Sequence, residues 1–268
     1  MRDELTKPSS ETATAQIDPV ALGRRSLTTP LRKRFYTTVE AKPHQDGFAV
    51  VLDGRPVLTP AKARLSLPTL AAAEAIAGEW QAQGDEIDPT VMVLTRIVNS
   101  AIDGVAQAMD AVAEDIVKYA GTDLVCYRAG EPASLVKAQA AAWDPVLAFA
   151  EVDIGARFLC AEGIIHVQQP ESSMLAVRAK LDRVTGVGAA APIALACLNV
   201  MTTLTGSALI ALARVSGAMT LEQAWETAHV DEDFQIQIWG ADQEAMDRRA
   251  RRWAEIAAAD RLWHLVST

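Results

Sequence analysis

The pattern of hydrophobic and polar positions divides the chain into three parts. Residues 1–30 are polar and lack both periodicity and a cluster of large apolar side chains, which predicts a mobile tail. Residues 31–103 begin with short runs of strand-forming residues, and residues 104–268 are dominated by apolar positions at helical spacing. The pattern predicts an α+β fold, in which a small β-rich N-terminal domain with a linking helix precedes a larger, mostly α-helical domain.

Three short segments near the start of the N-terminal domain are predicted to be strands. They are Phe35–Val39, Phe48–Leu52 and Arg55–Thr59. Residues 44–47 predict a turn between the first two strands. Asp53 and Gly54 predict a hairpin between the second and third, because a type I′ turn needs positive φ at both central residues.

Apolar residues spaced three and four apart predict the helices. The first helix follows Pro68 and carries Trp80, and the pair Asp88 and Pro89 predicts a helix start with the carboxylate as cap and proline in the first turn. Pro145 should kink or restart the helix that contains it. Further apolar stripes run over residues 109–120, 135–150, 174–184, 221–228 and 246–257.

Three segments have patterns that need interpretation. Residues 158–167 contain glycine and are expected to hold a strand pair. Phe234–Ile238 alternates like a strand, but its helical surroundings favour a helix. Val184–Ala213 has no charge, yet glycines, a proline and polar side chains interrupt it, so we expect one or two helices buried in a protein core and no membrane insertion.

Charge and cysteine content limit the kinds of partner. With 25 Lys and Arg against 34 Asp and Glu, the net charge is −9. This charge argues against non-specific binding to nucleic acid or to an anionic membrane, and it suits a partner with a basic patch. The three cysteines, Cys126, Cys160 and Cys197, have no CxxC spacing and lie among apolar neighbours, so we expect buried, reduced thiols.

The N-terminal residues carry acidic side chains and no apolar segment. Asp3, Glu4 and Glu11 are unlike both a secretory signal and an Arg-rich mitochondrial presequence. We therefore expect a protein of the bacterial cytoplasm.

Familiar catalytic and cofactor-binding motifs do not account for the sequence. Residues 186–191 match a loose GxGxxA pattern, but a charged helical segment precedes them and no acid follows at the required distance. A turn that leads into a buried helix explains them better. The four histidines are too dispersed for a zinc-binding pair, and Ser207 lacks the flanking glycines of a nucleophile elbow. The sequence predicts no catalytic residue, no metal and no cofactor.

An acidic trio and the tryptophans remain as candidates for partner contact. Residues 231–233, Asp-Glu-Asp, are either a solvated helix start or an acidic contact for a basic surface. Most of the six tryptophans are expected in or beside the core. One or two of them could anchor a partner, since tryptophan is enriched in binding hot spots.

Four segments resemble a known family in their order and spacing. They are residues 118–146, residues 79–96, Thr205–Ala213 and Glu232–Gly240, and the first contains Thr122–Ala129 and Trp143–Val146. This set resembles the assembly chaperone that attends the α subunit of the F-type ATP synthase in mitochondria and alphaproteobacteria. The resemblance covers residues 33 to 255, and the lack of a presequence points to the bacterial branch.

The resemblance implies a protein that is not an enzyme. It would bind the free α subunit, cover apolar surface that later meets the β subunit, and be displaced when the catalytic hexamer forms. We expect a monomer when free and no small-molecule substrate. The resemblance makes Glu232 an acidic contact with the partner, with Asp231, Asp233 and Trp239 beside it. Structural roles are expected for Trp80, Asp123, Tyr127, Trp143, Asp144 and Pro145.

Two alternatives stay open from the sequence. One is an enzyme without a linear motif, whose acids would be brought together from Asp123, Asp144, Glu162 and Glu232. The other is a permanent subunit of a stable complex. Convergent carboxylates in a deep polar pocket would favour the enzyme, and a broad, partly apolar surface would favour the chaperone.

Overall fold

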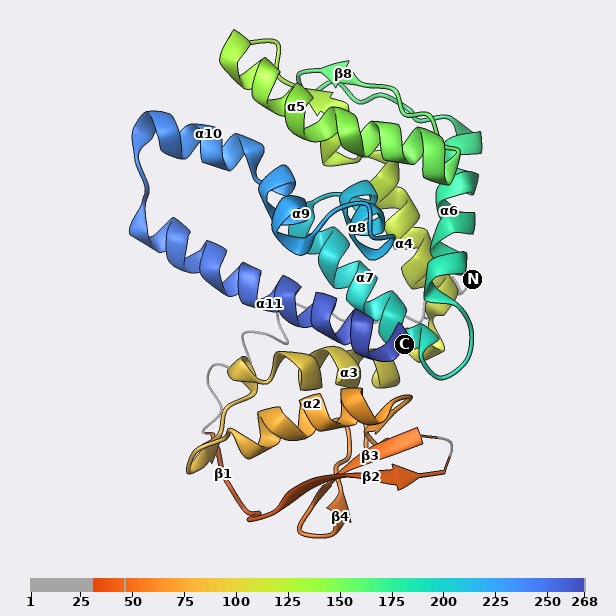
Figure 1. Ribbon diagram of the computed structural model, residues 1–268, viewed down its shortest axis with the longest axis vertical. Helices are drawn as coiled ribbons and strands as arrows, with labels where there is room; N and C mark the ends of the chain where they lie inside the picture. Colours follow the sequence, from red (N-terminus) through yellow and green to blue (C-terminus); the bar gives the residue numbers. More distant parts are fainter. Residues whose placement is uncertain (1–30, 46, 268) are drawn as a thin grey trace, which may run out of the picture.

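The protein has a strand layer at one end and a larger array of helices at the other (Figure 1). The computed structural model describes residues 31–45 and 47–267, so the predicted tail, residues 1–30, lies outside the described residues. The predicted α+β fold is confirmed. Helices α2 (Leu70–Gln81) and α3 (Val93–Asp103) lie between the strand layer and the other helices.

The strand layer is a small antiparallel sheet in which one strand pairs with three others. The central strand is β3 (Gly47–Leu52), and its partners are β2 (Val39–His44), β4 (Arg55–Pro56) and β5 (Ser66–Leu67). A separate pair joins β1 (Arg32–Lys33) to β6 (Glu86–Ile87). Asp53 and Gly54 have φ angles of 47° and 80°, so the predicted type I′ hairpin is confirmed.

The strand predicted at Phe35–Val39 is wrong, because β2 begins only at Val39. The backbone N–H groups of Thr37 and Thr38 donate to the Asp53 carboxylate at distances of 3.1 and 2.8 Å. The ring of Tyr36 turns into the core, where its hydroxyl donates to the Trp80 carbonyl at 2.7 Å. These side-chain contacts take the place of a strand ladder.

Helix α2 covers the sheet and is fastened to α3 through one carboxylate. Thr69 caps α2, as its hydroxyl accepts from the Ala72 N–H. Glu79, near the end of α2, accepts from the backbone N–H groups of Leu94 and Thr95 at 2.7 and 2.8 Å. Glu79 therefore caps the first turn of α3 from a neighbouring helix, which fixes the two helices against each other. The predicted cap at Asp88 is confirmed, although it opens only a single 3₁₀ turn, η1 (Pro89–Val91).

The other helices lie around or beyond α7 (Ala191–Thr205), which packs against α3, α4, α8 and α11. Their bounds are α4 (Met109–Gly121), α5 (Ala133–Phe149), α6 (Glu171–Thr185), α8 (Ala208–Val215), α9 (Leu221–Ala228), α10 (Val230–Trp239) and α11 (Gln243–Ser267). Short elements join them: η2 (Val105–Gln107), η3 (Leu124–Cys126), β7 (Tyr127–Arg128), η4 (Ala150–Ile154) and β8 (Ala161–Glu162).

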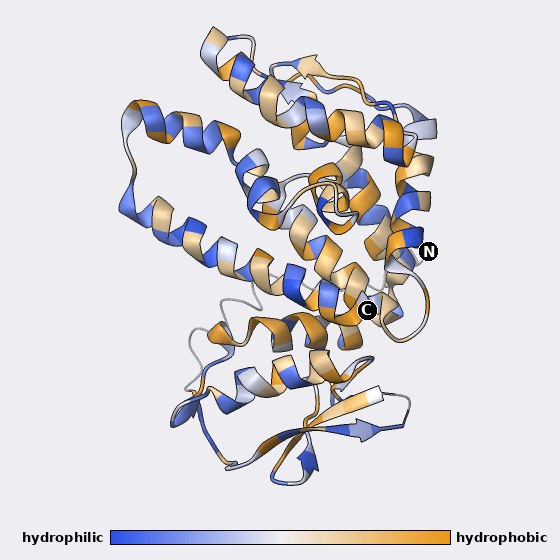
Figure 2. Ribbon diagram, in the orientation of Figure 1, coloured by the Kyte–Doolittle hydropathy of each residue, from blue (hydrophilic) through white to orange (hydrophobic). Residues whose placement is uncertain are grey.

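Helices α7 and α8 form the apolar centre (Figure 2). These two helices account for most of Val184–Ala213, the segment without charged residues, so the prediction that it forms buried helices is confirmed. In residues 31–45 and 47–267, no helix is long and apolar enough to span a bilayer. Buried apolar side chains continue from the sheet through α2 and α3 to the larger helical region. The predicted division of the chain at residues 103 and 104 stays a prediction.

Several local predictions are corrected by the structure. Residues 158–167 do not pair with each other, because β8 pairs in parallel with the distant β7. Helix α5 continues through Pro145 instead of restarting there. Cys160 is exposed, whereas Cys126 and Cys197 are buried as expected. The apolar stripe over residues 246–257 predicts a buried side chain at Met246, but this residue is exposed on the first half of α11.

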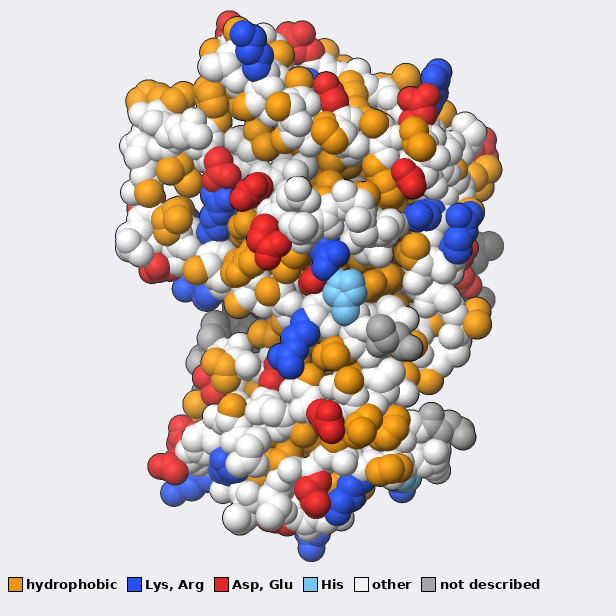
Figure 3. All heavy atoms as spheres, in the orientation of Figure 1, with side chains coloured by type: hydrophobic (Ala, Val, Ile, Leu, Met, Phe, Trp, Pro, Cys, Tyr) orange, Lys and Arg blue, Asp and Glu red, His pale blue; other side chains and the backbone are white. Residues whose placement is uncertain are grey.

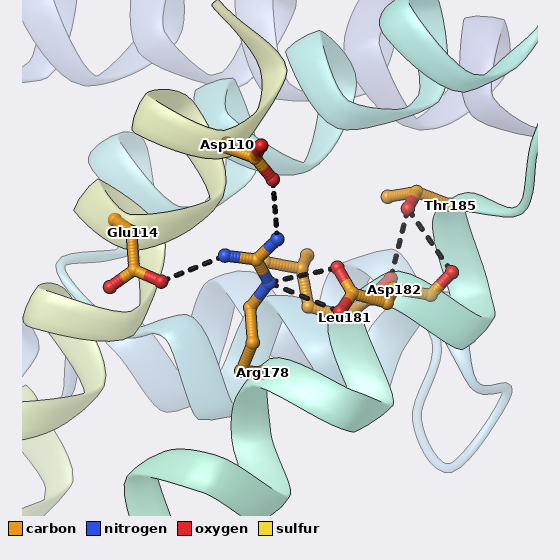
Figure 4. A network of polar contacts seen from close by, with 6 residues as sticks. All are labelled: Asp110, Glu114, Arg178, Leu181, Asp182 and Thr185. Atoms are coloured by element: carbon orange, nitrogen blue, oxygen red, sulfur yellow. Dashed lines mark hydrogen bonds and ion pairs between the residues drawn. The ribbon is translucent and has the colours of Figure 1, made fainter.

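An arginine-centred cluster fastens α4 to α6 (Figure 4). Arg178 of α6 contacts Asp110 and Glu114 of α4 at 2.8 and 2.7 Å, and Asp182 of its own helix at 2.9 Å. These partners, Asp110 first, raise the pKa of Arg178. The carboxylates are exposed, so the cluster holds the two helices in register without contributing much free energy.

Two tryptophans in contrasting surroundings allow a matched test of the fold. Trp80 is half-buried and contacts the Tyr36 ring edge-on, whereas Trp239 is 82% exposed. We expect Trp80→Arg to lower the free energy of unfolding by about 3 kcal/mol, through lost packing and a poorly solvated charge. The same change at Trp239 should alter it by less than about 0.5 kcal/mol. Urea unfolding of both variants measures this, and equal effects would show that Trp80 does not support the fold.

Candidate partner-binding surface

Helix α10 and the first half of α11 project from the helical region (Figure 1). We call residues 230–253 the arm. None of the residues of α10 is buried, although the helix contains Phe234, Ile236 and Ile238. Ile238 and Trp239 are 53% and 82% exposed, and apolar side chains gather over the outer end of the arm (Figure 3). The arm therefore presents apolar surface that the rest of the described chain leaves uncovered.

The local sequence explains why this segment is helical without a core to support it. Three acids occupy the first turn of α10, where the helix dipole favours negative charge. Gly240 adopts a φ of 84° and ends the helix just after Trp239. Asp242 then begins α11, as its carboxylate accepts from the Ala245 N–H at 2.9 Å.

The three acids of the predicted contact are not equivalent. Asp231 accepts from the Gln139 amide of α5 at 2.7 Å, and Asp233 pairs with Arg249 of α11. Glu232 lies 3.6 Å from the Arg252 guanidinium, and its side chain is 53% exposed. Asp231 therefore holds the arm to α5, and Asp233 holds the two helices of the arm together. Glu232 is the acid that remains exposed on the surface of the arm.

A buried histidine lies at the base of the arm. His229 is 2% exposed, its Nδ1 hydrogen-bonds with the Trp225 carbonyl at 2.7 Å, and its Nε2 lies 3.8 Å from Glu232. Burial lowers the pKa of His229, more than the Trp225 carbonyl and the Glu232 charge raise it. A neutral imidazole leaves Arg252 as the cation nearest to Glu232.

The four acids of the enzyme alternative lie in different surroundings. Asp123 is completely buried, whereas the Asp144 side chain is 64% exposed and pairs with Arg128 at 3.0 Å. Glu162 lies on β8, and Glu232 lies on the arm. Within residues 31–45 and 47–267, no three His, Cys, Asp or Glu side chains are placed to hold a metal ion. Of the four acids, Asp123 and Asp144 are engaged by partners of their own, the Leu209 N–H and the Arg128 guanidinium.

Asp123 instead organises the backbone. Its two carboxylate oxygens accept from the N–H groups of Val125 and Leu209 at 3.3 and 3.1 Å, so one side chain caps both η3 and α8. Burial raises its pKa to about 6, against the opposing effect of hydrogen bonds from Ser207 and the backbone. This geometry supports the prediction that Asp123 is a structural residue.

Two other residues expected to be structural, Trp143 and Asp144, contact Arg128. Trp143 is buried, its indole N–H donates to the Thr227 carbonyl at 2.8 Å, and the Arg128 guanidinium lies over its ring at 5.3 Å. Tyr127 is half-buried, with its hydroxyl 3.4 Å from His166. Pro145 is exposed, and the structure gives it no contact that explains a structural role.

A groove beside the strand layer was not foreseen from the sequence. Its volume is about 1050 Å³, and its lining includes Phe35, Trp80, Pro56 and Arg55. The sequence contained a signal, because Phe35 beside the buried Tyr36 is 61% exposed. Because the pattern of residues 35–39 predicts a strand, the position of Phe35 did not point to a groove.

Comparisons with known proteins agree with the fold. The sequence model of the ATP12 chaperone protein matches residues 33–151. The structure of Atp12 from Paracoccus denitrificans is 41% identical, with a TM-score of 0.80 over 88% of this chain and 98% of that one. The chain belongs to the ATP12 chaperone family. The resemblance noted in the sequence is thereby confirmed.

Two further family structures are similar. A protein from Agrobacterium tumefaciens described as a candidate chaperone is 43% identical, with a TM-score of 0.84 over 94% of this chain and 92% of that one. A mutant of Atp12p from P. denitrificans is 40% identical, with a TM-score of 0.80 over 88% of this chain and 98% of that one. These structures come from bacteria, and the family description points to a chaperone rather than an enzyme.

The buried carboxyl of Asp123 gives the family fold a testable pH dependence. A carboxyl whose pKa rises from 3.8 to about 6 on folding binds protons more tightly in the folded state, so its contribution to stability falls as the pH rises towards 6. Relative to Asp123→Asn, the native protein should gain about 1 kcal/mol of unfolding free energy between pH 7 and pH 5. Urea titrations at both pH values measure this gain. A constant difference between the two proteins would mean that Asp123 is ionised throughout that interval.

Proposed function

We propose that this protein is an assembly chaperone for the F-type ATP synthase, which binds the free α subunit and is displaced by the β subunit. Membership of the ATP12 chaperone family, with similarity along nearly the whole chain, is the observation that carries this proposal. The resemblance in the sequence supplies the identity of the partner. The protein works as a monomer in the bacterial cytoplasm and needs no cofactor.

The physical task explains why such a protein needs no catalytic site. An unpartnered subunit exposes a large apolar interface, and a stoichiometric cover lowers the concentration of the aggregating species. Release without nucleotide hydrolysis requires only that the native partner bury more, or better-matched, surface. An affinity that is moderate and reversible suits this role, because a very tight complex would resist displacement by β.

The arm is the surface that we assign to the α subunit. Trp239 and Ile238 supply exposed apolar area, and tryptophan is the residue most enriched at binding hot spots. Glu232 supplies a nearby charge, with Asp231 and Asp233 holding the helix that carries it. A matching surface on α would combine an apolar depression with a basic side chain.

The role of Glu232 can be separated from general loss of negative charge. We expect Glu232→Lys to weaken binding of the α subunit at least about tenfold, because it removes an attractive charge and places a repulsive one there. Isothermal titration calorimetry with purified α measures the affinity. Glu244→Lys is the matched control, since Glu244 lies on the same arm, is more exposed and pairs with Arg248. It should bind nearly as well as the native protein.

Arg252 and Arg249 near Glu232 call for a further control. A lysine at position 232 would repel these cations and could loosen the base of the arm. Glu232→Gln removes the charge without the repulsion, and circular dichroism checks that both variants stay folded. Native affinity in a folded Glu232→Lys protein would exclude Glu232 from the interface.

The choice of partner is tested by co-purification with separately expressed α and β subunits of the cognate ATP synthase. We expect a soluble one-to-one complex with α, and its loss when β is added. Persistence of the protein in the assembled enzyme would identify it as a permanent subunit. Failure to bind α would refute the proposed partner, and binding to β alone would reassign it.

A further inference from the structure

Two cysteines that are distant in the sequence meet where β7 and β8 begin. The parallel pair aligns Tyr127 with Ala161 and Arg128 with Glu162. Cys126 and Cys160 each come directly before the first aligned pair, so the register places them opposite each other. Paired strands lie about 5 Å apart, and Cys126, the last residue of η3, and Cys160 are each one residue from such a pair. This spacing falls within the Cα separation that disulfides adopt.

The two side chains also influence each other. Together with burial, Cys160 acts on the Cys126 thiol and helps to raise its pKa. Burial is the main cause that raises the pKa of Cys126, the charge of Asp123 comes next, and Cys160 adds to both. The backbone register places the two residues side by side, and the influence of Cys160 on the Cys126 pKa agrees with that placement.

The segment that carries Cys160 is fixed on both sides of it. The Gln169 side chain exchanges two hydrogen bonds with the backbone of Leu159, at 2.8 and 2.9 Å. The Gly163 N–H donates to the Arg128 carbonyl at 2.9 Å. Gly130 approaches so closely that a Cβ there would lie 2.0 Å from the Glu162 carboxylate. These contacts hold the Cys160 segment in its register against β7.

The two thiols differ in access to solvent. Cys160 is exposed, whereas Cys126 is completely buried beside it. A soluble oxidant therefore meets Cys160 first, and Cys126 is held where only its neighbour can react with it. Cys197, on α7, is fully buried and serves as an internal control.

We propose that Cys126 and Cys160 form a reversible intramolecular disulfide, which makes this pair a site of redox modification by peroxides. The Cys160 thiolate attacks the O–O bond of hydrogen peroxide, which yields a sulfenic acid and, with a proton, water. The Cys126 sulfur then displaces hydroxide from the Cys160 sulfur. The Cys126 proton leaves with that hydroxide as a second water, so the two thiols lose two electrons and two protons.

The bridge would restrain an apolar loop. Ile164 and Ile165 follow Cys160 closely and are 98% and 76% exposed. A covalent link from Cys160 to the start of β7 limits how far these side chains can move away from the helical region. The second step is slow, because the raised pKa of Cys126 leaves little thiolate. The pair is therefore suited to sustained oxidation rather than to rapid signalling.

Thiol counting and peptide mapping test this proposal on the full chain. After treatment with hydrogen peroxide, the thiols titrated under denaturing conditions should fall from three to one. Mass spectrometry without reduction should show the peptides of Cys126 and Cys160 joined and lighter by two hydrogen atoms, with Cys197 unmodified. Dithiothreitol should restore all the thiols. Accumulation of Cys160 sulfinic acid with free Cys126, or bridges between chains, would overturn the proposal.

Variants and thermal melting supply independent checks. After treatment with hydrogen peroxide, the Cys160→Ser variant should keep its two thiols, Cys126 and Cys197. The Cys197→Ala variant should lose both of its thiols, because Cys126 and Cys160 form the disulfide. The melting temperature of the oxidised native protein should be about 5 °C higher than that of the reduced protein, because the bridge closes a loop of more than thirty residues. An unchanged or lower value would show that the native fold does not accommodate the bridge. Peptide mapping of the native protein decides the question even if a variant fails to fold.

Discussion

The burial of α7 is the constraint on which the rest of the structure depends. Apolar side chains occupy nearly all sides of this helix, so it must be surrounded, and α3, α4, α8 and α11 surround it. The last half of α11 is committed to this packing through Ile256, Leu262 and Trp263. The first half of the same helix extends beyond the end of α7, and only its last residues, among them Arg252 and Trp253, reach the body of the protein. The arm is therefore a consequence of a helix that is longer than the core it packs against.

This division explains which parts of the fold could be predicted from the sequence. Helical periodicity identified α2 and α9, since this signal depends on neighbouring residues alone. The hairpin at Asp53 and Gly54 was predicted correctly for the same reason. The prediction of a strand at Phe35–Val39 was wrong because the backbone N–H groups of Thr37 and Thr38 donate to the Asp53 carboxylate. Asp53 comes near this segment only because the chain folds back at the hairpin.

The site was predicted less completely than the fold. The resemblance pointed to Glu232 and Trp239, and the structure shows both on the surface of the arm. It could not reveal that Asp231 and Asp233 are engaged within the protein, because their partners, Gln139 and Arg249, lie on other helices. The exposure of Cys160 was missed for a similar reason. Apolar neighbours in sequence indicate burial only when the segment is itself packed in a core.

The arm also shows how an apolar binding surface can coexist with solubility. An exposed tryptophan favours association with any apolar surface, including that of a second copy of the chain. Here Asp242 and Glu244 follow Trp239 closely, and the net charge of the chain is −9. Two copies that approach through the arm bring like charges together, whereas a partner with a basic patch does not. These acids raise the energy of self-association, and Glu232 is the acid that we assign to the contact with a basic partner. Because an exposed ion pair such as Glu232 with Arg252 contributes no more than about 1 kcal/mol, exchanging Arg252 for a cation of the partner costs little.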